Sequence, residues 1–310
     1  MTDFWPADGV WLRCALHAHT TRSDGELAPA GLAQHYARAG YDVLAITDHW
    51  ARTDTEPVGD LLVIPSVELN CVLPEARDGH VLGFGIACEP AELAALGTEY
   101  ADLARTADWI EEHGGIAFLA HPYWTGAIPG RLELPANVVG IEVFNAGCEL
   151  EVGRGLSSVH WDELLEAGRV CPAIATDDSH HPGFDSDHAW TWVRAAERST
   201  AAVLGALAAG SFYSTCGPAI HDIRRAKGDG EEVEVRCSPC RAVTLVAGKS
   251  KGAAVNAGRL GYRHGGTVLS TDDAGLITAA RLTIPAATTH VRVELTDAGG
   301  RKAWANPIVL

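Results

Sequence analysis

Residues 11–25 are Trp-Leu-Arg-Cys-Ala-Leu-His-Ala-His-Thr-Thr-Arg-Ser-Asp-Gly, a largely apolar run that ends in two histidines and a polar turn. Short apolar runs bounded by turn residues are typical of buried strands. Side chains alternate along a strand, so His17 and His19 point to the same face and can bind one ion together. This stretch therefore predicts a buried strand with a metal-chelating pair at its C-terminal end.

The same kind of run recurs as far as residue 180, alternating with stretches at helical spacing. Repeated βα units of this kind predict an α/β fold, and strands buried on both faces are nearly all apolar. Strands are expected over Trp11–His19, Asp42–His49, Leu61–Leu69, His80–Ile86, Gly115–His121, Val138–Asn145 and Pro172–Thr176. Helices are expected over Pro29–Ala39, Glu89–His113, about 155–167 and Thr200–Ala209, each followed closely by glycine.

The pattern changes after Cys216-Gly217-Pro218, where short alternating segments are separated by turns rich in Gly, Asp and Asn. Such alternation predicts antiparallel β structure. We therefore expect two domains, an α/β domain over residues 1–216 and a small β-sandwich-like module over 217–310.

Composition bounds the class of protein. The 310 residues are 47% hydrophobic and 21% charged, which is ordinary for a packed globule, and no apolar run is long enough to cross a bilayer. The N-terminus lacks the basic and apolar regions of a secretory signal, so a cytoplasmic location is expected. The eight cysteines are scattered and are expected to be free thiols. Cys237 and Cys240 have CxxC spacing but lack the second pair that a zinc ribbon needs.

The net charge of −16 disfavours binding of long nucleic acid, because neutralisation of phosphates supplies most of that affinity. A small substrate is expected instead. Bound cations can reverse the sign of the field locally, so an anionic substrate remains compatible with this charge.

Metal-binding residue types fall at the ends of the expected strands: His17, His19, His49, Glu68, His80, His121, Asp177, Asp178, His180 and His181. In a barrel of parallel strands the C-terminal ends converge on one face, so these residues would meet there. His80 begins its run, which indicates that its strand or a neighbouring one is irregular or reversed. Imidazole and carboxylate together suit zinc, iron and manganese, and one glutamate can bridge two ions.

Taken in order, these motifs resemble the PHP (polymerase and histidinol phosphatase) family over residues 11–216. The motifs are Leu16–Gly25, Ile46-Thr47-Asp48-His49, Glu68, His80, Ala120-His121-Pro122 and Asp178-Ser179-His180. The resemblance implies a distorted (β/α)7 barrel that holds two or three divalent ions, and its characterised members are mainly phosphoesterases. It assigns the first ion to His17, His19, Glu68 and Asp178, the second to Glu68, His80 and His121, and the third to Asp24, His49 and His180. The C-terminal part is similar to a branch with a β-rich tail, in which some relatives are associated with carbamate or ester cleavage.

Further residues have two interpretations each. Asp48 and Asp177 either orient an imidazole or serve as turn residues, and His181 either donates to the substrate or is an exposed loop histidine. Arg22 is a candidate for binding a phosphate oxygen and otherwise forms a surface salt bridge. Asn145 either contacts the substrate or a ligand, or caps its strand. The tryptophans Trp124, Trp190 and Trp192 are candidates for lining a pocket for a ring, although core packing also accounts for them.

The leading hypothesis is a metal-dependent phosphoesterase whose substrate is a small phosphate monoester, a nucleotide or an oligonucleotide end. Three divalent ions and the carboxylates of Asp24, Glu68 and Asp178 would leave roughly +3 in the pocket, and a metal-activated hydroxide would attack phosphorus with Glu68 bridging two ions. The alternatives are a metal-dependent carbamate or carboxylic ester hydrolase and a non-catalytic metal-binding module. Metal identity, the exact substrate and the oligomeric state stay open.

Overall fold

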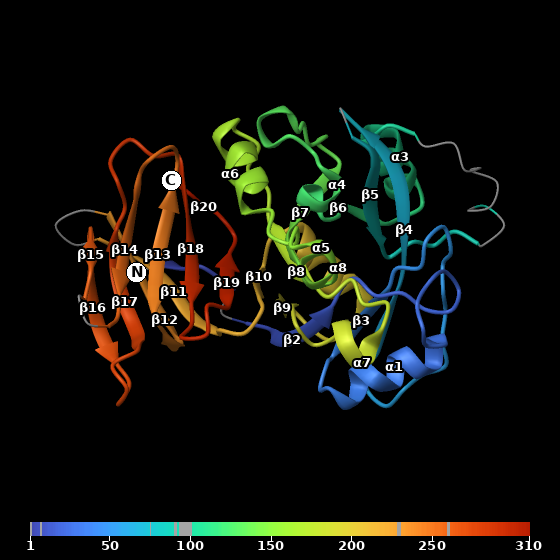
Figure 1. Cartoon of the computed structure of the whole chain (residues 1–310), viewed down its shortest axis with the longest axis horizontal. Coiled ribbons are helices and arrows are strands. Elements are labelled where there is room, and N and C mark those ends of the chain that lie inside the picture. Colours follow the sequence, from blue (N-terminus) through green and yellow to red (C-terminus); the bar gives the residue numbers. More distant parts are fainter. Residues whose placement is uncertain are drawn as a thin grey trace. The chain divides into compact units, whose positions relative to one another are not determined.

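The computed structural model describes residues 2–6, 8–74, 76–89, 92, 101–227, 231–258 and 261–310, and Figure 1 labels its helices and strands. The chain separates into two compact units. One unit is Val10–Gly210, and the other joins Met1–Gly9 to Ser211–Leu310. The domain ranges 1–216 and 217–310 stay predictions, and the first nine residues are grouped with the C-terminal unit.

The unit Val10–Gly210 has a mixed α/β fold, as predicted. Its strands are β2 (Val10–Ala15), β3 (Val43–Ile46), β4 (Leu62–Leu73), β5 (Ala76–Phe84), β6 (Ile116–Leu119), β7 (Val138–Asn145), β8 (Ala173–Thr176) and β9 (Trp190–Ala195). They are hydrogen-bonded in the order β9-β2-β3-β4-β5-β6-β7-β8. β2–β3–β4 and β6–β7–β8 are parallel, whereas β5 is antiparallel to both neighbours. The indication of a reversed strand at His80 is thus confirmed. β9, which was not predicted, pairs antiparallel with β2.

Backbone pairing continues beyond the strand ends and carries the histidines and carboxylates with it. The His19 amide donates to the Ser179 carbonyl at 2.9 Å, and the Asp178 amide donates to the His17 carbonyl at 3.0 Å. His49 and Glu68 form a similar parallel bridge. Residues from distant parts of the sequence are therefore fixed side by side by main-chain hydrogen bonds.

The described residues of this unit form seven α-helices. They are α1 (Pro29–Arg38), α3 (Leu103–Glu112), α4 (Pro122–Thr125), α5 (Ala146–Val152), α6 (Ser158–Glu166), α7 (Pro182–Asp185) and α8 (Thr200–Ala208), with a 3-10 turn η1 at Pro129–Arg131. The expected helix Glu89–His113 falls partly on residues 90, 91 and 93–100, which lie outside the described residues. Its described part, α3, begins at Leu103 after Asp102, whose side chain accepts from the Arg105 amide. The short helices α4, α5 and α7 were not predicted, because four to seven residues are too few to display a helical period.

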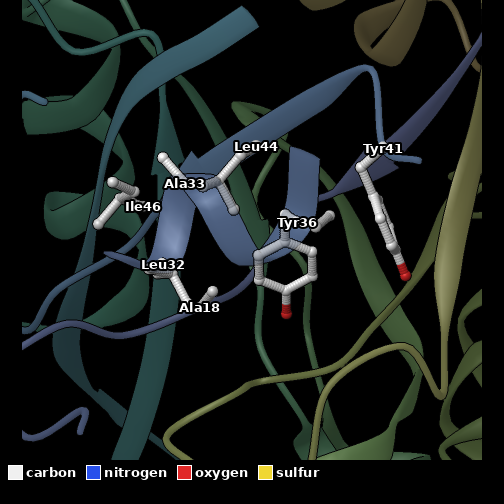
Figure 2. Close-up of a cluster of buried hydrophobic side chains, with 8 residues drawn as sticks. Ala18, Leu32, Ala33, Tyr36, Tyr41, Leu44 and Ile46 are labelled. Carbon is white, nitrogen blue, oxygen red and sulfur yellow. The ribbon is translucent and has the colours of Figure 1, made fainter. Parts of the chain in front are cut away.

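Helix α1 buries its apolar face against the sheet. Figure 2 shows Leu32, Ala33 and Tyr36 of α1 in a cluster with Leu44 and Ile46 of β3, and these side chains are fully buried. The cluster also reaches the strand ends, because the Tyr36 hydroxyl donates to Asp177 Oδ2 at 3.0 Å. Core packing therefore helps to fix the loop after β8.

The C-terminal unit contains the predicted antiparallel β structure. One sheet has the order β1 (Thr2–Asp3), β11 (Ile220–Lys227), β12 (Glu231–Cys240), β17 (Ile277–Thr283), β16 (Gly266–Thr271). A second run of strands has the order β15 (Arg263–His264), β14 (Gly252–Asn256), β13 (Ala242–Ala247), β18 (His290–Thr296), β19 (Lys302–Ala305), β10 (Phe212–Thr215), and β20 (Ile308–Val309) pairs with β18. The pairing of β1 with β11 explains why the N-terminal residues belong to this unit.

Two expectations from composition can be compared with the structure. All eight cysteines are free thiols, and all but Cys216 are buried. Among the described residues, no helix has both the length and the apolar character needed to span a membrane.

Candidate metal centre

All nine residues expected to bind metal lie together in the unit Val10–Gly210. They occupy strand ends or the turns after them, apart from Glu68 and His80, which lie within β4 and β5. Seven of them line a pocket of about 460 Å³, and the other two, His17 and His19, are fully buried. The pocket is lined by Asp24, His49, Glu68, His80, His121, Trp124, Gly147, Cys148, Leu150, Glu151, Asp178, His180, His181, Phe184 and Asp185.

The first expected set forms a tight group of four ligand atoms. His17 Nε2 and His19 Nε2 each lie 3.2 Å from Glu68 Oε2, and they lie 3.1 and 3.2 Å from Asp178 Oδ1. The two Nε2 atoms and Asp178 Oδ1 are buried without a hydrogen-bond partner. Ligands that share one tetrahedral ion at 2.0–2.2 Å are about 3.3–3.6 Å apart, so these separations are slightly shorter than the edges of such a coordination shell.

The second expected set is centred on the other oxygen of Glu68. Glu68 Oε1 lies 2.9 Å from His80 Nδ1 and 3.3 Å from His121 Nε2. His80 Nδ1 is also buried without a hydrogen-bond partner. Its other ring nitrogen contacts Asn70 Nδ2 at 3.0 Å, and Trp50 Nε1 donates to Asn70 Oδ1, which fixes the ring. One carboxylate thus faces two groups of histidines, as a bridging ligand would.

The third expected set is more open. Asp24 Oδ2 lies 3.4 Å from His180 Nε2 and 3.6 Å from His49 Nε2. The Asp24 side chain is 53% exposed, whereas Glu68 is 1% exposed, so solvent reaches this set far more easily. The turn that carries Asp24 needs a glycine next to it, because a Cβ on Gly25 would lie 2.3 Å from the His19 carbonyl oxygen.

The ionisation of these groups reflects their mutual contact. Burial by itself lowers the pKa of His17, but the charges of Asp178 and Glu68 outweigh it and raise that pKa well above its usual range. His19 behaves similarly, with burial opposed by its close contacts with Asp178 and Glu68, and its pKa rises to about 9. Burial alone raises the pKa of Glu68, yet the histidines around it lower that pKa well below its ordinary value. Positive charge is therefore required among these carboxylates, and protons and metal ions compete to supply it.

Glu142 was not predicted as a site residue, although it directly supports one. Its Oε1 lies 2.8 Å from His17 Nδ1 and accepts from the Thr176 hydroxyl, while its Oε2 accepts from the His121 amide at 2.9 Å. A fully buried carboxylate behind an imidazole fixes the ring and its tautomer, so that Nε2 is free to bind an ion. The available signal was a glutamate inside the otherwise apolar strand β7.

The polypeptide is strained where it presents two of these ligands. His121 has φ 25° and Asp178 has φ 54°, both in the region that residues other than glycine rarely adopt. The Asn145 side chain donates to Glu142 Oε2 and to Asp178 Oδ2, and its own oxygen caps α5 through the Cys148 amide. These contacts correspond to the ligand-contacting and capping interpretations of Asn145, and a role in binding substrate stays a prediction.

Asp48 and Asp177 hold loops through their described contacts. Asp48 accepts from the Thr20 amide and from the hydroxyls of Thr20, Ser23 and Thr53. Asp177 accepts from the Tyr36 hydroxyl and from the amides of residues 187, 188 and 189. Among the described residues both carboxylates accept hydrogen bonds from hydroxyls and amides. This pattern is typical of a residue that holds a turn.

The remaining candidates lie at or outside the pocket. His181 lines it, with a side chain that is 66% exposed and lies 3.5 Å from Glu26. Trp124 lines it as well, whereas Trp190 stacks on the Arg13 guanidinium. Arg22 is exposed and does not line the pocket. Among the residues that the structure describes, no Lys or Arg lines this pocket.

Cys148 was considered only as a buried thiol, and it lies against the centre. Its Sγ is 3.9 Å from Asp178 Oδ2, and together with His121 and Asp178 it forms a further group able to hold an ion. Gly147 before it allows close approach, because a Cβ there would lie 2.8 Å from the Asp178 carbonyl oxygen.

The fold has a counterpart among solved structures. A two-domain protein from Bacteroides vulgatus, which contains a predicted PHP-like metal-dependent phosphoesterase, is similar at a TM-score of 0.54 with 16% sequence identity, covering 100% of this chain and 98% of that one. Weaker likenesses are to an amidohydrolase from Chromobacterium violaceum (TM-score 0.39, 19% identity, 56% and 89% covered) and a lesion-specific endonuclease from Pyrococcus furiosus (TM-score 0.45, 11% identity, 64% and 56% covered). No family model matches the sequence. No curated protein matches it either. The chain therefore shares its fold with the two-domain protein from Bacteroides vulgatus.

Proposed function

We propose that this protein is a metal-dependent hydrolase that cleaves the phosphoester of a small substrate. The observation that carries the proposal is the set of buried, unpartnered ligand atoms, His17 Nε2, His19 Nε2, His80 Nδ1 and Asp178 Oδ1, around the two oxygens of Glu68. Burying polar atoms without partners costs about 1–3 kcal/mol each, so a native fold retains such a cluster only where something else binds it.

The donor set fits divalent ions. Imidazole nitrogens and carboxylate oxygens suit zinc, manganese and iron, and the described residues form overlapping groups of possible ligands that share His19, His49, Glu68 and Asp178. We propose two or three ions, with His17, His19, Glu68 and Asp178 as the deepest set. The more exposed Asp24, His49 and His180 would form the set nearest to solvent.

When bound, such ions lower the pKa of water and neutralise charge that develops on a phosphoryl group. In the hydrolysis, the oxygen of water bonds to phosphorus, the bond from phosphorus to the alcohol oxygen breaks, and the alcohol leaves with a proton. Glu68 would hold ions through its two carboxylate oxygens, and Glu142 keeps His17 oriented. His181, which lines the mouth, is the candidate donor of that proton.

A carbamate or carboxylic ester is the second candidate substrate. The specific observation in its favour is that no Lys or Arg among the described residues lines the pocket, so the charge of a phosphate would rest on the ions alone. A neutral ester carries no such charge. The two candidates therefore differ in how strongly they depend on the third, most exposed set of ligands. A non-catalytic metal-binding module is the remaining alternative.

Elemental analysis of the purified protein combined with a substrate screen tests these proposals. We expect two or three ions per chain and release of phosphate from p-nitrophenyl phosphate that stops on chelation and returns with metal. Turnover of an aryl carbamate without any release of phosphate would show that the substrate is a carbamate or carboxylic ester instead of a phosphoester. Bound metal without hydrolysis of any ester in the screen would favour the non-catalytic metal-binding module.

We propose that the unit Val10–Gly210 is a distorted (β/α)7 barrel and that the C-terminal unit is sandwich-like. A phosphorylated small molecule is the proposed partner, in keeping with the net charge of −16.

A further inference from the structure

Apolar side chains line part of the pocket. Three side chains that line it form what we call the apolar rim: Trp124 on α4, Leu150 on α5 and Phe184 on α7. Leu150 is 47% exposed and Phe184 is 70% exposed. Phe184 contributes little to the free energy of folding, because most of its surface stays in water.

Two side chains of the apolar rim, Trp124 and Phe184, line the pocket together with the expected ligands. The Trp124 ring packs edge-on against His121, with centroids 4.9 Å apart, and lies 5.9 Å from His80. Its Nε1 donates to Glu151 Oε2 at 2.9 Å, which fixes the indole. Phe184 lies four residues after His180, and its amide donates to the His181 carbonyl at 2.7 Å. Helices α5 and α7, which carry Leu150 and Phe184, are in contact.

Charge around the rim is negative. Glu151 and Asp185 line the pocket, and no Lys or Arg does so among the described residues. The carboxylate of Asp185 is already engaged by the Ser179 hydroxyl and by the amides of His180 and His181. Glu151 remains exposed beside the indole, where it would repel a second anionic group of a substrate.

We propose that the apolar rim selects substrates whose leaving group is an uncharged ring, so that the substrate class is a phosphoester with one phosphoryl group on a flat apolar moiety. This inference rests on the proposed function, since it places the phosphoryl group at the ligand cluster. The ring then lies between Trp124 and Phe184 and covers Leu150. Sugar bisphosphates and other substrates with a second charge are excluded by Glu151 and by the absence of any cation on the described rim.

Phosphonates test the selectivity without requiring hydrolysis. Binding of methylphosphonate, benzylphosphonate and 4-carboxybenzylphosphonate to the zinc-loaded protein is measured by titration calorimetry. The first two differ only in the ring, and the third adds a charge to it. We expect benzylphosphonate to bind at least about tenfold more tightly than methylphosphonate, the range in which one stacked ring contributes. The carboxylated ring should lose that advantage.

Variants identify the residues responsible. Phe184→Ala and Leu150→Ala should each bring the ratio of benzyl to methyl affinity towards one, without changing the affinity for methylphosphonate. Val152→Ala is the matched control, because Val152 is 56% exposed on the same helix as Leu150 but does not line the pocket. It should keep the wild-type ratio.

The outcomes separate this inference from the proposed function. Equal affinity for the methyl and benzyl compounds, or an unchanged ratio in both Phe184→Ala and Leu150→Ala, overturns the ring selectivity while the phosphoryl site stands. Ring-selective binding without hydrolysis of any phosphoester supports the ring selectivity of the apolar rim and overturns the proposed catalysis. Binding of neither phosphonate overturns both.

Discussion

Each of the two units buries charged side chains, and the two do so in opposite ways. In the C-terminal unit Glu294 is paired on both oxygens: Oε2 accepts from Arg292 Nη1 at 3.1 Å, and Oε1 accepts from Lys302 Nζ. In the α/β unit the described partners of Glu68 and of Asp178 Oδ1 are imidazoles, and several of the ring nitrogens have no hydrogen-bond partner.

The difference shows how to separate structural charge from functional charge. A buried ion pair that satisfies itself is complete within the fold and needs nothing from solution, although removal of one partner leaves the other charge uncompensated. A buried cluster of acceptors and ring nitrogens is complete only when cations or protons bind it. The four predictions below test this contrast.

The largest effect should follow removal of the bridging carboxylate. Glu68→Ala is expected to lower ester hydrolysis by at least about a thousandfold, because two sets of ligands lose their shared oxygen atoms. Metal content measured by elemental analysis should fall in parallel, and His17→Ala should behave in the same way. Full turnover with unchanged metal content would contradict the assignment.

Removal of metal should destabilise the α/β unit. Chelation is expected to lower the free energy of unfolding by about 3–4 kcal/mol, the linkage expected for an ion present at several hundred times its Kd. Thermal melts with and without added zinc measure this difference. The same difference should persist in Glu294→Gln, since that residue lies in the other unit. A melting temperature that does not respond to metal would count against a site of this affinity.

Glu142→Gln should have an intermediate effect. The amide retains the shape of the side chain but removes the charge that fixes His17, so metal affinity should fall about 10–100-fold. Competition with a chelator of known affinity measures this loss. The circular dichroism spectrum should stay that of the wild type. An unchanged affinity would show that the Glu142–His17 contact is structural only.

The smallest effect concerns Glu294 and is pH-dependent. Burial raises the pKa of Glu294, but the charges of Arg292 and Lys302 outweigh burial and lower it below its usual value. Its contribution is therefore present above about pH 4.5 and is lost as the pH falls through the lowered pKa. Glu294→Gln should reduce the free energy of unfolding by about 1–2 kcal/mol at pH 7 and by less at pH 3.

Urea unfolding at several pH values measures this contribution of Glu294 to the free energy of unfolding. Asp273→Asn is the control, because Asp273 is exposed and should show no such dependence. A Glu294→Gln deficit that grows as the pH falls would reverse the sign and refute the pairing.

Much of this molecule could be predicted from its sequence. The strands of the α/β unit carry continuous apolar runs, and one of them, Val138–Asn145, has the predicted bounds. Histidines and carboxylates at the ends of these runs predicted a shared site, because the ends of neighbouring strands lie close together. The start of one run at His80 also indicated the reversed strand β5.

The sequence did not reveal what supports that site. In the sequence Glu142 is a single glutamate within a mainly apolar strand, and its contact with His17 spans 125 positions in the chain. The short helices that carry Leu150 and Phe184 have no detectable period. The pairing of β1 with β11 joins the first residues to the C-terminal unit, and two residues are too few to show a pattern.

The sequence by itself determined which residues are able to bind metal and which segments are buried, since both follow from side-chain chemistry and local periodicity. Only the tertiary structure decided which nitrogen and oxygen atoms remain without partners, and which apolar side chains stand at the mouth of the pocket. Hydrogen bonds and exposure depend on atoms brought together from distant positions, and local patterning does not encode those distances.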